Sequence, residues 1–305
     1  MEIESKNPKI NLYVQRDFST KITDSFLFVR ENWKLLLKYF ITYMLPFSIL
    51  QTYFMNGYVD AAMTDIAGAS TLSGSIFSWT YLGLLVTSVL GSVVACSLFY
   101  TLFFLYQERE ERLGGIGWQD IRPVFVKFVG RSFILMGFLL LVFILFVAAM
   151  VFLASLTTFT LLFTTPLFFA CIVPLALFFP AYYLNREDEG IGAVFVWSFR
   201  RGFRFWGGTF LVMLVCYLVM SVIGGIFSIP WYAIYFTKVF LGVGSIASEN
   251  VVMNLVQYVL GVLMILGTYL SLVFQLLGIT LQYGHVCEKT EAVTVDADIE
   301  NFDKV

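Results

Sequence analysis

Apolar stretches long enough to cross a membrane alternate along the chain with shorter segments that mix basic and aromatic residues. The segment GIGAVFVWSFRRGFRFW, at 190–206, is basic and aromatic, and residues 207–231 after it carry no charge. An uncharged helix of about 20 residues spans a hydrocarbon layer of ~30 Å. A helix that mixes basic and aromatic residues suits the headgroup layer. This pattern predicts an interfacial helix followed by a membrane span.

Six spans are predicted from such apolar runs, at 35–55, 76–106, 132–156, 166–184, 207–231 and 251–283. Before the first, third and fifth spans, apolar residues recur at helical spacing, which predicts amphipathic helices at 17–34, 118–131 and 188–206. The predicted fold class is all-α: a polytopic membrane protein with six transmembrane helices and three cytoplasmic interfacial amphipathic helices. We expect a polar N-terminal segment at 1–16, a single transmembrane domain at 17–284, and an acidic, disordered cytoplasmic tail at 285–305.

Capping residues and prolines refine these bounds. Asp17 and Asp120 are predicted to cap the first and second amphipathic helices. Pro46 predicts a kink in the first span, and Pro174 with Pro180 predicts a bent fourth span. A bend can open a cavity, but a kink without one is commoner.

Small residues recur at steps of four in the second span. They are Gly83, Thr87, Gly91 and Ala95. Such a row lets another helix approach closely. Helix packing is the simpler interpretation, and the lining of a substrate path is the alternative.

The composition fits a chain whose solvent is lipid. Hydrophobic residues make up 59% of it and charged residues 13%, whereas globular domains have roughly 25% charged residues. None of the four cysteines forms a CxxC spacing, so buried, reduced cysteines are expected. One histidine in the chain argues against a histidine-based metal centre.

The basic residues are distributed unevenly over the two sides that six spans define. The termini and the loops near 107–131 and 185–206, with the adjoining span ends, hold 18 of the 19 Lys and Arg residues, which leaves Lys238 for the other side. Basic loops stay in the cytoplasm. We therefore expect both termini to be cytoplasmic in a bacterial inner membrane, with 57–75, 157–165 and 232–250 on the outer side.

Three units of one amphipathic helix and two spans begin near Asp17, Trp118 and Asp188. The second and third share the order Val-Phe-Val, at 124–126 and 194–196. All three units have the same predicted orientation, so a threefold parallel repeat is one interpretation. Shared membrane patterning is the other.

The chain lacks the usual marks of catalysis or coupled transport. No Asp, Glu, Lys, Arg or His lies at the centre of a predicted span, and ion-coupled transporters hold such groups there. No GxxxxGK[ST], HExxH or GxSxG motif occurs. We expect no enzyme activity, no catalytic residue, no metal and no cofactor.

Two sets of residues are candidates for a functional role. Basic residues of the second and third amphipathic helices could bind lipid headgroups, at about 1 kcal/mol per charge near an anionic surface, although orienting the spans is their simpler role. Polar residues within the spans could form a polar bundle interior, where interhelical hydrogen bonds are the simpler interpretation. The first set is Arg122, Lys127, Arg131, Arg200, Arg201 and Arg204, and the second is Gln51, Ser92, Gln257, Ser271 and Gln275.

The opening DFSTKITDSFLFVRENWKLLLKYF, the six spans, the interfacial helices and the closing DIENFDKV resemble a group of uncharacterised bacterial six-span membrane proteins. That group is similar to the membrane domain of glycerophosphoryl diester phosphodiesterases, and the tail and aromatic richness most resemble its Bacteroidetes members. The diesterase barrel's acid, base and metal ligands have no counterpart here, so its activity is not carried over. The resemblance implies a cytoplasmic-membrane protein concerned with lipids or the envelope.

Two functions remain open from the sequence. The first is a non-enzymatic integral membrane protein involved in lipid interaction or envelope organisation, with anionic lipids as expected partners. The alternative is an uncoupled transporter or channel for a small or amphiphilic molecule, suggested by the kinked fourth span and the row Gly267, Ser271 and Gln275. No nucleic-acid partner is expected, and a homo-oligomer or a complex with another membrane protein is left open.

Overall fold

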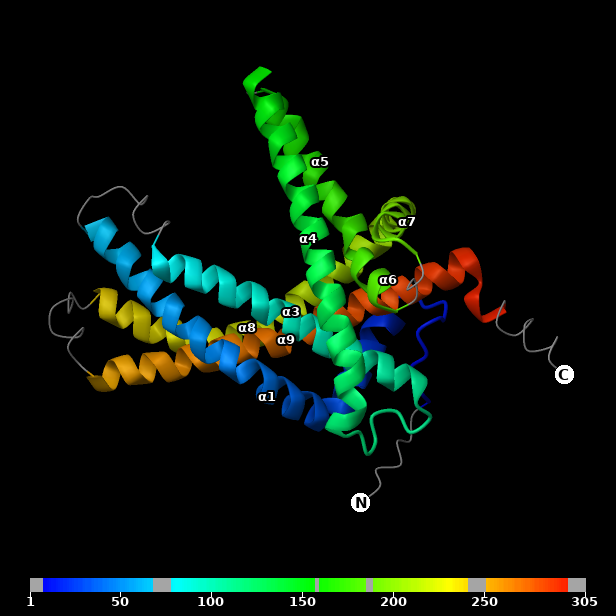
Figure 1. The fold of residues 1–305 in the computed structure, drawn as a ribbon, viewed down its shortest axis with the longest axis horizontal. Coiled ribbons are helices and arrows are strands. Elements are labelled where there is room, and N and C mark those ends of the chain that lie inside the picture. The colour runs from blue at the N-terminus through cyan, green and yellow to red at the C-terminus, as the bar shows by residue number, and fades with distance from the viewer. Residues whose placement is uncertain (1–7, 68–77, 157–158, 185–188, 241–250, 296–305) are drawn as a thin grey trace. The chain divides into compact units, whose positions relative to one another are not determined.

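A computed structural model describes residues 8–67, 78–156, 159–184, 189–240 and 251–295. The regular elements within these ranges are eight α-helices (Figure 1). They are α1 (Phe18–Ala67), α3 (Trp79–Glu108), α4 (Trp118–Leu156), α5 (Phe159–Ala176), α6 (Phe178–Leu184), α7 (Ile191–Arg204), α8 (Trp206–Phe240) and α9 (Val251–Glu291). The all-α prediction is confirmed.

Six segments of the described chain are long and apolar enough to cross a membrane. They are Phe18–Ala61, Trp79–Glu108, Trp118–Ser155, Pro166–Leu184, Trp206–Lys238 and Val251–Glu291. Their number equals the number of predicted spans. Each overlaps one predicted span, so hydropathy located all six.

The chain divides into two compact units. Unit 1 comprises Met1–Asn32, Ser97–Tyr217 and Phe274–Val305, and unit 2 comprises Trp33–Cys96 and Leu218–Val273. Helices α1, α3, α8 and α9 therefore contribute residues to both units. Helices α4 to α7 belong to unit 1 alone, where α4 and α5 run side by side as a hairpin (Figure 1).

The predicted amphipathic helices differ in how they join their spans. In α1 the predicted segment 17–34 continues directly into the span, giving one helix of 50 residues, about 75 Å long. Helix α4 likewise combines 118–131 with the third span. No proline stands at either junction, and Gly130 beside the second one does not interrupt the helix, so the backbone hydrogen bonds continue. Only α7 is a separate helix: it stops at Phe205, which leaves helical geometry before Gly207 and Gly208.

Several predicted loops are shorter than expected because the helices extend into them. Helix α1 reaches Ala67, α5 already begins at Phe159, and α8 reaches Phe240. The rest of the predicted outer loops lies largely outside the described residues. The predicted disordered tail is also wrong at its start, since α9 continues to Glu291; residues 296–305 lie outside the described part.

The predicted bend of the fourth span is a break between two helices. Helix α5 ends at Ala176 and α6 begins at Phe178, and the Leu177 N–H donates to the Pro174 carbonyl at 3.2 Å. Proline lacks the N–H that an uninterrupted helix needs. The break is therefore the local consequence of Pro174 and Pro180.

The core of unit 1 surrounds the second half of α3. Tyr100 and Tyr106 are fully buried there, and Tyr100 stacks on Tyr183 of α6 with ring centroids 4.2 Å apart. The Tyr183 hydroxyl lies 2.5 Å from the Ser132 hydroxyl of α4. Aromatic stacking and a buried hydrogen bond thus fix α3, α4 and α6 together.

The polar segment before α1 also packs in unit 1. We call residues 8–16 the N-terminal strap. The Ile10 N–H donates to the Tyr106 hydroxyl at 3.1 Å, and Gln107 Nε2 donates back to the Ile10 carbonyl at 2.8 Å. A Cβ on Gly284 of α9 would lie 2.1 Å from the Leu12 carbonyl oxygen. Glycine is therefore required where the strap crosses α9.

Unit 2 is held by close contacts at small residues. A Cβ on Gly91 would lie 2.0 Å from the Tyr269 hydroxyl, and one on Gly83 would lie 2.3 Å from the Phe54 ring. Gly267 of α9 makes the same kind of close contact, with the side chain of Phe227. The row of small residues predicted in the second span is thus a contact surface for neighbouring helices.

Candidate functional site

Helix α7 buries one face and exposes the other. Its buried face contains Val194, Ser198 and Gly202, and it packs mainly on α5. A Cβ on Gly202 would lie 2.5 Å from Pro174 Cα, so these two backbones are in direct contact. The spacing of four residues between the buried positions fixes which residues face away.

The exposed face of α7 combines apolar and basic side chains. Val196 is 62% exposed and Phe203 is 43% exposed, while Arg200 and Arg204 are exposed beside them. Large apolar groups in water are unfavourable by about 25 cal/mol per Å². A face that presents them together with guanidinium groups suits the boundary between hydrocarbon and headgroups.

Arg201 does not belong to this exposed face. It is half-buried, and its Nη2 lies 3.9 Å from Glu291 Oε1 of α9. The same carboxylate oxygen accepts a hydrogen bond of 2.7 Å from Trp197 Nε1. Arg201 therefore joins α7 to α9, although the sequence grouped it with Arg200 and Arg204.

The start of α4 has a similar face. Val126 is 61% exposed, and Arg122 and Lys127 are exposed near it. Ile121 and Phe128, on the other side of the helix, are fully buried. Of the first candidate set, the structure thus places Arg122, Lys127, Arg200 and Arg204 on exposed faces that also carry apolar side chains.

Arg131, the remaining basic candidate, makes its contacts with another helix of unit 1. Its Nη2 donates to the Tyr182 carbonyl, and its Cζ lies 4.6 Å from the centroid of the Tyr182 ring. A guanidinium held by a carbonyl and an aromatic face is fixed in one orientation. Its contacts position α6 against α4.

Acidic residues stabilise the starts of α1 and α4 in two ways. The Thr20 N–H donates to Asp17 Oδ1 at 3.2 Å, so Asp17 is the predicted cap. Hydrogen bonds from Thr20 lower the pKa of the exposed Asp17 carboxyl. Asp120 instead reaches back from the first turn and accepts a bond of 2.9 Å from the Gly117 N–H, so the cap residue itself is Gly117.

Two of the polar candidates in unit 2, Gln51 and Gln257, make hydrogen bonds between helices. Gln51 Nε2 donates to the Ser88 hydroxyl at 2.5 Å, and Gln51 Oε1 accepts from the Tyr269 hydroxyl at 3.0 Å. Lys238 donates to Gln257 and, at 2.6 Å, to Asn254. These contacts agree with the interpretation as interhelical hydrogen bonds.

The other three polar candidates do not join this network. Ser92 is exposed, contrary to the predicted interior position, because the buried small residues of α3 lie on another face. The Ser271 hydroxyl bonds to the Thr268 carbonyl of its own helix at 2.8 Å. Gln275 Oε1, in the part of α9 that belongs to unit 1, is buried without a hydrogen-bond partner.

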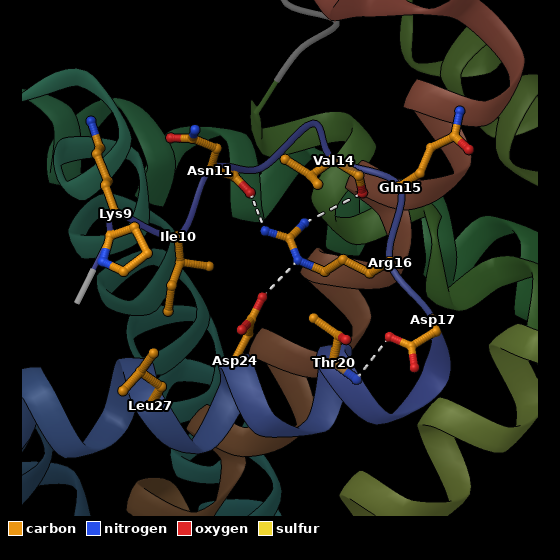
Figure 2. Close-up of a pocket in the computed structure, with 11 residues that line it drawn as sticks. Lys9, Ile10, Asn11, Val14, Gln15, Arg16, Asp17, Thr20, Asp24 and Leu27 are labelled. Carbon is orange, nitrogen blue, oxygen red and sulfur yellow. Dashed lines mark hydrogen bonds and ion pairs between the residues drawn. The ribbon is translucent and has the colours of Figure 1, made fainter.

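A cavity of about 280 Å³ lies between the N-terminal strap and the first turns of α1 (Figure 2). Arg16 extends across it, and its Nε donates to Asp24 at 2.8 Å. The Arg16 Nη atoms donate to strap carbonyls, including Leu12 at 3.2 Å. The guanidinium is thus fully occupied by the protein. The lining residues are Pro8, Lys9, Ile10, Asn11, Val14, Gln15, Arg16, Asp17, Thr20, Asp24 and Leu27, which include none of the candidates from the sequence.

Within the described ranges, no group of three or more His, Cys, Asp and Glu side chains is placed to hold a metal ion. All four cysteines are free. The contacts of Arg16 and Lys21 could not be predicted from local spacing, because their partners His285 and Gln282 lie 269 and 261 residues away along the chain. No protein-family model, no curated protein and no solved structure matches this chain.

Proposed function

We propose that the protein is a non-enzymatic, multi-pass protein of the bacterial cytoplasmic membrane that binds lipid headgroups. The working surface is the pair of exposed faces on α7 and on the start of α4. The observation that carries the proposal is the arrangement of Val196 and Phe203 beside Arg200 and Arg204, all exposed on one face of α7.

The burial of the apolar helices supports lipid as the surrounding solvent. The most apolar window of α4 has a mean hydropathy of 3.1, yet only 6% of it is buried. In α8, only 11% of the most apolar window is buried. Water would strongly disfavour so much exposed apolar surface. Acyl chains accommodate it without cost, because they are as apolar as the side chains.

The charge distribution gives the proposed orientation. Arg122, Lys127, Arg200 and Arg204 all fall on the side that holds 18 of 19 basic residues. That side is the cytoplasmic one by the preference of basic loops. The cytoplasmic leaflet carries anionic lipid, which attracts basic residues near its surface. The partners in this proposal are anionic phospholipids.

The proposal is tested by counting retained lipids. Delipidated protein in a neutral detergent is titrated with phosphatidylglycerol or phosphatidylcholine, and bound lipids are counted by native mass spectrometry. Arg200→Gln should weaken phosphatidylglycerol binding about fivefold, since one surface charge is worth about 1 kcal/mol. Arg201→Gln is the matched control, because this neighbour pairs with Glu291 and should have a smaller effect. Equal effects of the two variants would contradict the proposed face.

An uncoupled transporter or channel is the second candidate function. It is favoured by the unpartnered Oε1 of Gln275 and by the break at Leu177 in the fourth span. A polar atom without a partner is costly in a bilayer and is expected at functional positions. Solute efflux from proteoliposomes tests it. Efflux that Gln275→Leu abolishes would support transport, and efflux no faster than from protein-free vesicles would exclude it for that solute.

A further inference from the structure

Lys21 of α1 is a buried ammonium without an acidic partner. The residue is 5% exposed, and its Nζ donates to Gln282 Oε1 of α9 at 2.7 Å. Among the residues that the structure describes, no carboxylate lies within ion-pair distance of it. Burying an ionised ammonium is expensive unless an anion or several acceptors surround it. One amide oxygen leaves most of its donor capacity unused.

Other cations gather around Lys21 within unit 1. Lys289 and Arg16 lie close enough for their charges to repel it. Lys289 Nζ lies 5.6 Å from the centroid of the Phe205 ring, and Arg204 Cζ lies 5.8 Å from the same centroid. Two cations therefore lie near the Phe205 ring, one at the end of α7 and one on α9.

Residues of α9 connect Phe205 to Lys21. Gln282, His285 and Lys289 follow one another at spacings of three and four, which places them on one face of the helix. The His285 ring centroid lies 6.4 Å from that of Phe205. We call Lys21, Lys289 and Arg204 the cationic cluster.

The acidic residues nearby do not neutralise this cluster. Asp24 is bonded to Arg16 at 2.8 Å, so that charge is already matched. Asp17 attracts Lys21, but it is exposed and caps α1 through Thr20. Of the charged groups that act on Lys21, Arg16 and Lys289 therefore repel it, and only the exposed Asp17 carboxylate attracts it. This excess of positive charge around a buried ammonium favours the binding of an anion.

We propose that the cationic cluster binds the phosphate group of a lipid headgroup. Phosphate accepts charge-assisted hydrogen bonds from ammonium and guanidinium groups, which are about twice as strong as neutral ones. The assignment of this phosphate to a lipid rests on the proposed function and on the position of Arg204 and Phe205 in the chain. Arg204 and Phe205 directly precede the apolar helix Trp206–Lys238, so an acyl chain has apolar surface beside the site. Lys289 and Arg204 are exposed and form its entrance.

The test uses the full-length, delipidated protein in neutral detergent and three probes. They are short-chain phosphatidic acid, the matching diacylglycerol without phosphate, and inorganic phosphate. Phosphatidic acid should bind at one site by titration calorimetry, and diacylglycerol should not. Lys21→Met and Lys289→Gln should each weaken that binding about tenfold, the equivalent of one charge-assisted hydrogen bond. The controls are Lys38→Met and Lys38→Gln, which change an exposed lysine of α1, the helix that also contains Lys21.

The outcomes separate this site from the proposed function. Unchanged phosphatidic acid binding in both Lys21→Met and Lys289→Gln overturns the site, and the proposed face still stands if Arg200→Gln lowers phosphatidylglycerol retention. Weakened binding in these lysine variants supports the site even if Arg200→Gln has no effect. Inorganic phosphate that binds as tightly as phosphatidic acid overturns the lipid source. Lys289→Gln, at an exposed position, keeps the test decisive if Lys21→Met does not fold.

Discussion

Close approach at Gly202 is the residue-level feature on which the exposed face of α7 depends. A Cβ there would lie 2.5 Å from Pro174 Cα and 2.7 Å from Pro174 Cβ. Backbone atoms cannot move aside as the end of a flexible side chain can. The orientation of Arg200 and Arg204 toward the outside therefore rests on a contact between two backbones.

Gly202→Ala should destabilise the protein by roughly 1–3 kcal/mol, the usual cost of overpacking a tight contact. Gly192→Ala is the matched control on the same helix, because a Cβ there meets nothing within 4 Å and alanine favours a helix by up to ~1 kcal/mol. Thermal unfolding in detergent measures both variants. Similar melting temperatures for the two would contradict the contact.

Single residues were predictable from the sequence where their partners are local. Asp17 caps α1 through Thr20, three residues away, and local spacing revealed it. Arg131 and Arg201 were grouped with headgroup ligands, yet their partners Tyr182 and Glu291 lie on other helices. Basic composition cannot show which guanidinium turns inward, because that depends on tertiary packing.

The amphipathic segments show the same limit at the scale of elements. Apolar periodicity located the segments at the starts of α1 and α4 and at α7, but it did not show that α1 and α4 continue unbroken into their spans. A continuous helix and a jointed one have the same apolar spacing. The adjacent glycines Gly207 and Gly208 are the one sequence signal for the break between α7 and α8.

The N-terminal strap was expected to be only a polar segment, but it ties three helices together. Arg16 holds Asp24 of α1 at 2.8 Å, and its backbone N–H donates to His285 Nδ1 of α9 at 3.1 Å. Lys9 Nζ donates to the Gln107 carbonyl at the end of α3 at 2.6 Å. A cation there complements the helix dipole.

Arg16→Met should therefore destabilise unit 1 by about 3–5 kcal/mol, because it leaves Asp24 and several strap carbonyls without their buried partner. Arg122→Met, at an exposed position, should stay within about 0.5 kcal/mol of the parent protein. Denaturant unfolding in mixed micelles gives both values. An Arg16→Met variant as stable as Arg122→Met would show that the strap does not hold the helices.

At the scale of the whole molecule, hydropathy alone predicted the number of apolar helices. Six segments of the described chain meet the length and composition needed to cross a membrane, and apolar runs identify these because the required length is set by the bilayer. The helix ends were less predictable. Helices such as α1 extend beyond their apolar runs, where backbone hydrogen bonding continues without any apolar signal.

We propose that the protein crosses the membrane six times with its basic face in the cytoplasm, and labelling at the two ends of α3 tests this orientation. This helix has 30 residues, about 45 Å, so both ends should clear a ~30 Å hydrocarbon core. Trp79→Cys and Glu110→Cys place thiols at its exposed start and just beyond its end. Both are made in a background lacking Cys96, Cys171, Cys216 and Cys287.

Spheroplasts are treated with a membrane-impermeant maleimide before and after permeabilisation. Trp79→Cys should be labelled in intact spheroplasts, and Glu110→Cys should be labelled only after permeabilisation. The reverse result would contradict the orientation. Equal labelling of both positions in intact spheroplasts would mean that α3 does not cross the membrane.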